Sequence, residues 1–139
     1  MVDQNCAYCM EGELVAKFGI KICELETSKV YLFKEQSHPG RCIVAHEKHV
    51  GDMNELTAEE RAAYFEDVAR VARAIMKAFN PDKVNYGAYG DTGHHLHFHL
   101  CPKYKDEYEW GGVFLMNPDK KYLTDEEYAD MIEKIKANL

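Results

Sequence analysis

The sequence predicts an α+β domain with an antiparallel sheet of about five strands, one long helix after the central strand, and a C-terminal helix. Short segments that alternate apolar and polar residues are typical of strands, and they fill the first third of the chain. Two longer segments repeat apolar residues at helical spacing, and each begins with a capping box. With 139 residues that are 46% hydrophobic, the chain suits a single domain, residues 1–139, that can bury a core.

The first half of the chain carries the expected meander and central strand. Three segments share the alternating pattern: residues 14–18, 21–25 and 29–33. Pro39-Gly40 belongs to a turn, and the apolar segment 41–45 that follows predicts a central strand. We expect His38 and His46, on either side of this strand, to lie at the surface.

Two capping boxes predict the helices. In Thr57–Glu60 the threonine hydroxyl and the glutamate carboxylate satisfy each other's free backbone amides, and the helix runs until Asn80-Pro81 ends it. Thr124–Glu127 opens a C-terminal helix, about residues 124–138, with an apolar stripe of its own. This stripe is expected to pack on the domain or on a second subunit.

The glycine-rich segment 87–93 links an expected strand, residues 83–89, to the histidine-rich strand. It lacks the Gly-Lys-Ser/Thr ending of a Walker motif and leads into a strand instead of a helix. Its glycines instead allow a tight bend and a close approach of backbone amides to a ligand. Trp110, beside two glycines, is read equally well as a packing anchor and as the rim of a site.

Residues 94–100 hold four of the seven histidines. A strand turns successive side chains to opposite faces, so one face is expected to carry His95, His97 and His99. A buried imidazole needs hydrogen-bond partners for its ring nitrogens, so three adjacent imidazoles are unfavourable in a hydrophobic core. We therefore interpret this face as functional, with His94 and the apolar residues on the other face.

Composition and charge exclude several classes of protein. A formal charge of −7 and a pI near 5.5 argue against a general nucleic-acid or membrane-surface binder, because those need a basic face. The N-terminus lacks the pattern of a signal peptide, and no apolar segment reaches membrane-spanning length. We expect a cytoplasmic protein whose five cysteines are thiols or metal ligands.

Cys6 and Cys9 form a Cys-x-x-Cys pair that can direct both sulfurs at one centre. A redox pair would be expected to open a helix of a thioredoxin-like fold, whereas strand-like sequence follows here, so zinc is favoured if two further ligands exist. The other cysteines lie in apolar contexts and are expected to be small buried hydrophobes: Cys23, Cys42 and Cys101.

Residues 95–101 read His-Leu-His-Phe-His-Leu-Cys, which resembles the motif His-φ-His-φ-His-φ-φ of the histidine triad family, φ being apolar. Pro39-Gly40, His49 before a valine, and Asn85 ahead of the glycine-rich turn extend the resemblance over residues 6–115. It is closest to the bacterial nucleotide hydrolase and transferase branch with Cys-x-x-Cys. The resemblance implies a histidine-triad-like fold, usually a homodimer, that binds purine nucleotides.

By the same resemblance, His97 attacks the α-phosphorus of a dinucleoside polyphosphate or an adenylated compound and forms a covalent nucleotidyl-histidine that water cleaves. Hydrolysis and nucleotidyl transfer both remain open, as do the base, the leaving group and a magnesium requirement. The side chains and amides expected to act on the phosphates are His99, Asn85, Asp91, Thr92 and Gly93. Asp91 stands where the family often has an amide, and we expect its carboxylate to cap the Gly90–Gly93 turn.

The resemblance also implies a structural zinc, because some family members use Cys-x-x-Cys in this way. Carried over residue by residue, the ligands are Cys6, Cys9, His49 and His95. A zinc-free site stays open, and His94 could replace a ligand only if the strand started irregularly. The family usually has proline where this chain has His46.

Two other functions remain possible. One is a nucleotide-binding or adaptor protein with little turnover, against which the intact His97 argues. The other is a metalloenzyme in which one open metal gathers His95, His97 and His99, leaving the two N-terminal cysteines idle.

Overall fold

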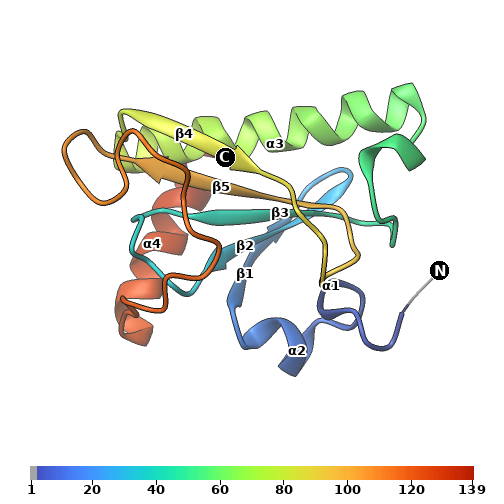
Figure 1. The fold of residues 1–139 in the computed structure, drawn as a ribbon, viewed down its shortest axis with the longest axis horizontal. Helices are drawn as coiled ribbons and strands as arrows, with labels where there is room; N and C mark the ends of the chain where they lie inside the picture. Colours follow the sequence, from blue (N-terminus) through green and yellow to red (C-terminus); the bar gives the residue numbers. More distant parts are fainter. Residues whose placement is uncertain (1–2) are drawn as a thin grey trace.

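The computed structural model describes residues 3–139, which form an antiparallel five-stranded sheet with helices on both faces (Figure 1). Every neighbouring pair of strands is antiparallel, in the order β1-β2-β3-β5-β4. The strands are β1 (Gly19–Glu24), β2 (Ser28–Phe33), β3 (Cys42–His46), β4 (Lys83–Gly87) and β5 (His97–Lys103). The predicted α+β class and central strand are confirmed.

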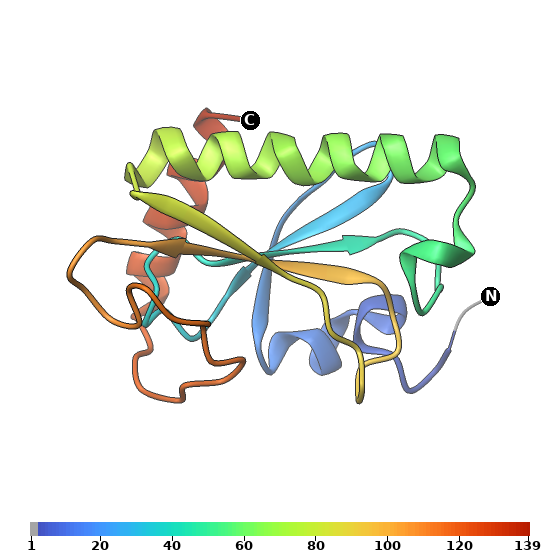
Figure 2. The same ribbon diagram turned by 45° about the horizontal axis from the view of Figure 1, so that its top comes forward.

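The two long helices lie against the same face of the sheet (Figure 2). They are α3 (Ala58–Phe79) and α4 (Asp125–Ala137), and each begins with the predicted capping box. α3 ends at Asn80, whose left-handed backbone (φ 50°) closes the last turn. A short 3-10 helix, η1 (Met53–Glu55), precedes α3. Among the described residues no helix is long and apolar enough to cross a membrane.

The prediction of a strand over residues 14–18 is wrong. Two short helices, α1 (Ala7–Met10) and α2 (Gly12–Ala16), occupy this part of the chain and lie on the opposite face from α3 (Figure 2). Glu11 separates them with a positive φ of 54°, which turns the chain. The helical turn buries Val15 in the small core that contains Tyr8. The alternating pattern of residues 14–18 does not reveal this contact.

The sheet separates a large core from a small one. Residues Val30, Leu32, Val44 and Leu100 face α3 and α4 in the large core. Alternate residues of the same strands point the other way and pack with Tyr8 in the small core: Tyr31, Phe33, Ile43 and Ala45. Because Ala45 pairs with His97 and Ile43 with His99, the triad lies on the face of the small core.

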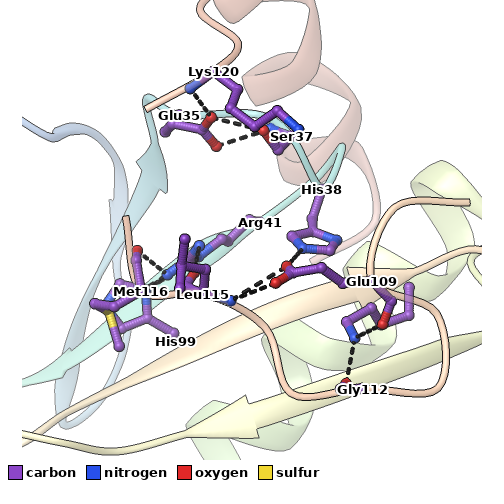
Figure 3. A network of polar contacts seen from close by, with 11 residues as sticks. Glu35, Ser37, His38, Arg41, His99, Glu109, Gly112, Leu115, Met116 and Lys120 are labelled. Atoms are coloured by element: carbon purple, nitrogen blue, oxygen red, sulfur yellow. Dashed lines mark hydrogen bonds and ion pairs between the residues drawn. The ribbon is translucent and has the colours of Figure 1, made fainter. Parts of the chain in front are cut away.

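A long irregular segment, residues 104–124, returns across one end of the sheet and is held by buried charged groups (Figure 3). Nζ of Lys103 donates to the carbonyls of Glu109 and Gly112, both at 2.8 Å. The Glu35 carboxylate accepts from the backbone amides of Lys120 and Lys121 at 2.8 and 2.9 Å. Burial alone would raise the pKa of Glu35, but these hydrogen bonds and those from Ser37 outweigh it and lower the pKa.

His38 is part of this anchoring and is buried, so its predicted surface position is wrong. Its Nε2 lies 2.6 Å from the Glu109 carboxylate, 71 residues further along the chain, and its ring contacts that of Tyr108 at 5.1 Å between centroids. Burial lowers the pKa of His38, although Glu109 opposes this shift. The segment 104–124 therefore covers His38, a contact that the sequence around His38 does not reveal.

Candidate functional site

A cleft of about 840 Å³ opens on the face of the sheet that carries the three histidines. Its walls come from the N-terminal segment, the turn before β5 and the segment after Gly112. The residues that these segments contribute include Tyr8, Tyr89, Thr92, Phe114, Leu115 and Asn117. The volume is within the range of small-molecule sites, which run from roughly 300 to 1,000 Å³.

The triad rings form one row at the base of this cleft. β5 begins at His97, so His95 precedes the regular strand, yet the rings of His95 and His97 both contact Tyr8 and therefore share a face. The rings of His97 and His99 are 5.4 Å apart, centroid to centroid. The expected alternation is present although the strand starts later than predicted.

His97 presents a free ring nitrogen to the cleft. Its Nδ1 lies 2.6 Å from the carbonyl oxygen of His95, and because a carbonyl only accepts, Nδ1 carries the proton. Burial lowers the pKa of His97, which keeps the ring neutral and leaves a lone pair on Nε2. Nε2 has no partner among residues 3–139, whereas every buried side-chain nitrogen there has one, so it is open to the cleft.

His99 lies against an arginine that the sequence analysis did not single out. The Arg41 guanidinium is fully buried and reaches His99 Nδ1 from Nη2 at 2.9 Å and from Nε at 3.3 Å. The one signal in the sequence is an arginine directly before an apolar strand, where a long charged side chain has no obvious route to water. Periodicity could not show that it turns towards the triad.

Tyr8, between the two N-terminal cysteines, is the other residue that the sequence analysis missed. Its ring lies 4.9 Å from the ring of His97 and 5.3 Å from that of His95, measured between centroids. Burial raises the pKa of Tyr8, so the phenol stays neutral. The N-terminal turn thus supplies two sulfurs and also one wall of the cleft, beside His97.

The four predicted metal ligands lie together. Nδ1 of His95 is 3.3 Å from Cys6 Sγ, 3.7 Å from Cys9 Sγ and 3.1 Å from Nδ1 of His49, and Cys9 Sγ is 3.2 Å from Nδ1 of His49. All four ligand atoms lie within 4.8 Å of one another. Tetrahedral zinc, with bonds of about 2.0 Å to nitrogen and 2.3 Å to sulfur, places its ligand atoms roughly 3.3 to 3.8 Å apart. The donor set and its spacing fit zinc.

The surroundings of this cluster orient the imidazole of His95 and place a carboxylate near that of His49. Nε2 of His95 lies 2.7 Å from the carbonyl of His46, so Nε2–H donates there and Nδ1 is left free for a metal. Nε2 of His49 lies 3.9 Å from the Asp3 carboxylate.

His46 itself is buried against Tyr64, and its Nδ1 accepts from the Lys48 amide, so its predicted surface position is wrong.

His94 lies outside the group of four ligands. Its ring centroid is 6.5 Å from that of His49, and the ring rests on Gly51, where a Cβ atom would come within 2.2 Å of it. The irregular start of the strand therefore leaves His95 in the ligand position.

The predicted nucleotide-binding residues are divided between two places. Asp91, Thr92 and Gly93 are exposed and line the cleft, whereas Asn85 lies half-buried in β4 opposite Cys101 and does not line it. No side-chain hydrogen bond of Asp91 is formed within residues 3–139, so the expected cap of the turn is not formed. Trp110 also lies outside the cleft lining and is 40% exposed.

A triad of imidazoles in a cleft, on an antiparallel sheet with the strand order β1-β2-β3-β5-β4, defines the class of histidine triad proteins. A sequence model of the HIT domain matches residues 19–106, and the chain belongs to this family. The fold neighbours include a histidine triad protein from Sinorhizobium meliloti, with a TM-score of 0.84, 24% identity, and coverage of 92% of this chain and 95% of that one.

Two curated relatives span most of the chain. The protein hit of Bacillus subtilis is 28% identical over an alignment of 123 residues that covers 84% of this chain and 83% of the relative. The adenosine 5'-monophosphoramidase hnt1 of Schizosaccharomyces pombe is 27% identical over an alignment of 116 residues that covers 77% of this chain and 80% of the relative. A HIT family protein from Bacillus anthracis has a TM-score of 0.64, with 26% identity and 98% of both chains covered.

Proposed function

We propose that this protein hydrolyses or transfers nucleotidyl groups of purine nucleotides by cleavage at the α-phosphate. The observation that carries the proposal is the ring of His97, whose Nδ1–H is held by a backbone carbonyl while Nε2 is open to the cleft. A neutral imidazole is a good nucleophile near pH 7 and can split one difficult displacement into two easier ones. The substrates we propose are dinucleoside polyphosphates and adenylated compounds, including the phosphoramidates for which the S. pombe relative is named.

The proposed reaction proceeds in two displacements. Nε2 of His97 attacks the α-phosphorus, the new N–P bond forms, and the bond from phosphorus to the leaving group breaks. Water then attacks the same phosphorus, loses a proton to solvent and leaves its oxygen on the nucleotide, which frees Nε2. If a second nucleotide or another acceptor takes the place of water, the same intermediate gives transfer instead of hydrolysis.

The remaining requirement is stabilisation of charge on the phosphoryl oxygens. The groups we propose for this role are the Thr92 hydroxyl, the Gly93 amide and His99, all of which line the cleft. Fixed donors of this kind stabilise the transition-state charge most effectively when they need not reorganise during the reaction. Asn85 lies in β4 outside the cleft lining, so we propose no direct contact between its side chain and the phosphates.

We also propose a homodimer, as the family resemblance implies. β4 lies at one edge of the sheet, and Tyr86 on this strand is 51% exposed. An edge strand with an exposed aromatic residue can pair with another chain. Sedimentation of the purified protein would measure the oligomeric state.

The test is to incubate the protein with adenine and guanine dinucleoside polyphosphates and with adenosine 5'-phosphoramidate and to resolve the products. Cleavage at the α-phosphorus, with a pre-steady-state burst of leaving group equal to the enzyme concentration, supports the proposal. Tight nucleotide binding with neither burst nor turnover would contradict it and would favour a nucleotide-binding or adaptor protein.

Asp91→Asn is expected to leave turnover equal or higher and to lower KM for an anionic nucleotide by up to about 5-fold, since one exposed negative charge near the phosphates contributes on the order of 1 kcal/mol. Asp91 is exposed at the cleft and forms no side-chain hydrogen bond with residues 3–139. The measurement is kcat and KM against pH for both proteins. If turnover instead falls by about 10²-fold or more and one limb of the pH profile disappears, Asp91 acts as an acid or base.

A further inference from the structure

Arg41 is a buried cation with no carboxylate in direct contact. Its guanidinium carbon lies 4.2 Å from the ring centroid of Phe33 and 4.9 Å from that of Phe114, so the cation lies over two aromatic rings. Apart from His99, its acceptors are the carbonyls of Leu115 and Met116, at 3.2 and 2.8 Å, and the Met116 sulfur. No ion pair of Arg41 occurs within residues 3–139, and burying a cation in this way is costly.

The segment after Gly112 is arranged around this cation (Figure 3). Glu109 accepts from the backbone amide of Leu115 at 3.0 Å, and the carbonyl of the same residue accepts from Arg41. Glu109 thus reaches the guanidinium only through the backbone of Leu115, which takes Nη1, while Nε donates to the triad and Nη2 is shared between the triad and Met116. A guanidinium used only for packing would not need two donors on one ring nitrogen.

The contact with His99 determines where the proton lies on that ring. A guanidinium has only donors, so His99 Nδ1 must accept from both Nε and Nη2. The neutral ring then carries its proton on Nε2. Nε2 has no partner among residues 3–139 and lines the cleft, so its N–H points to where a substrate would bind.

We propose that Arg41 is a positioning residue that fixes His99 as the neutral Nε2–H tautomer, so that His99 presents a hydrogen-bond donor to the phosphate and serves neither as acid nor as base. The assignment to the phosphate rests on the proposed function, whereas the tautomer itself does not. His97 and His99 then present complementary groups to the cleft: a lone pair on one ring and an N–H on the next, at a ring separation of 5.4 Å.

The electrostatic surroundings agree with a neutral ring. Burial first, then the positive charge of Arg41 and the neighbouring His97, lower the pKa of His99 to about 2. The other residues shown beside His99 carry no charge: the rings of Phe33 and Phe114, and its strand partners Ile43 and Gly87. Because the pKa lies below the working range, His99 stays unprotonated from pH 5 to pH 8 and contributes no limb to a pH profile there.

The first test needs no substrate. In the full chain labelled with ¹⁵N-histidine, long-range ¹H–¹⁵N correlation distinguishes the two tautomers and the imidazolium, and His99→Gln assigns the signals. The expected wild-type result is His99 as Nε2–H and His97 as Nδ1–H, with no titration of His99 between pH 5 and pH 8. A His99 signal of the Nδ1–H form, or one that titrates in that range, would overturn the proposal even if the protein proved to be a hydrolase.

The second test uses Arg41→Lys and Arg41→Met. Lysine can still donate to Nδ1, so the His99 signals should stay as in the wild type, whereas methionine keeps the bulk but not the donor and should give mixed tautomers or a raised pKa. An Arg41→Met spectrum identical to the wild type would contradict a positioning role. If the methionine variant does not fold, the wild-type spectrum still decides the tautomer, and an Arg41→Lys spectrum with His99 in the Nδ1–H form would contradict the positioning role.

A double-mutant cycle shows whether Arg41 acts through His99. Arg41→Met is expected to lower kcat by about 10²-fold with a smaller change in KM, as for loss of one fixed donor to a developing charge. In a His99→Ala background the same change should lower kcat less than about 3-fold, because the group being positioned is already absent. Equal losses in both backgrounds would show that Arg41 only supports the fold.

Discussion

His97→Ala is expected to lower the rate of the chemical step by about 10⁴-fold or more, because a covalent route loses its nucleophile. The fold should remain intact. The His97 ring lines the cleft beside Tyr8, so its removal enlarges a space that water already enters instead of leaving an empty cavity inside a core. The measurement is single-turnover cleavage, with nucleotide binding and thermal unfolding measured on the same variant.

The control is His97→Gly with added imidazole. Free imidazole can enter the space left by the ring and attack the same phosphorus, so it should restore part of the activity, whereas the wild type should not respond to it. A base-quenched reaction should also show labelled nucleotide attached to the wild-type chain and none on either variant. Most of the activity surviving in His97→Ala, with nucleotide binding unchanged, would eliminate the covalent mechanism.

The parts of the fold that local chemistry determines were predictable from the sequence. The two capping boxes place the starts of α3 and α4, since hydroxyl, carboxylate and backbone amide all lie within four residues. The alternation of residues 95–99 places three rings on one face for the same reason. In each case the interaction that determines the structure is encoded in neighbouring residues.

The errors occur where distant residues decide the outcome. His38 becomes buried because Glu109, 71 positions away, provides an acceptor for its ring, and no local pattern reveals such a partner. Residues 14–18 alternate like a strand, but packing of Val15 with Tyr8 favours a helical turn. Arg41 was missed for the same reason: its partners are a residue of β5 and two carbonyls beyond Gly112.

The four metal ligands were predicted from the family resemblance, and the structure gives a physical reason for their position. Without a metal, two thiols and two imidazoles whose ligand atoms lie within 4.8 Å offer each other few good hydrogen bonds. Zinc would satisfy all four at once. It would also connect the N-terminal turn, which carries Tyr8, to the loop after β3 and to the start of β5. Its proposed role is therefore structural, since four protein ligands close its coordination shell and leave His97 free.

We expect one zinc per chain, and we expect Cys6→Ser to lower Tm by on the order of 10 °C while lowering kcat less than about 10-fold in the protein that remains folded. The unfolded chain has no preformed site, so zinc binding adds to the free energy of unfolding, and loss of a thiolate weakens that binding. Cys23→Ser is the matched control, because it makes the same chemical change at a half-buried thiol of β1 outside the cluster and should keep its zinc. Elemental analysis and thermal unfolding of protein purified without chelator or affinity tag provide the measurement. A wild-type chain that contains no zinc, or a Cys6→Ser variant with the zinc content and Tm of Cys23→Ser, would show that these four residues do not form a zinc site.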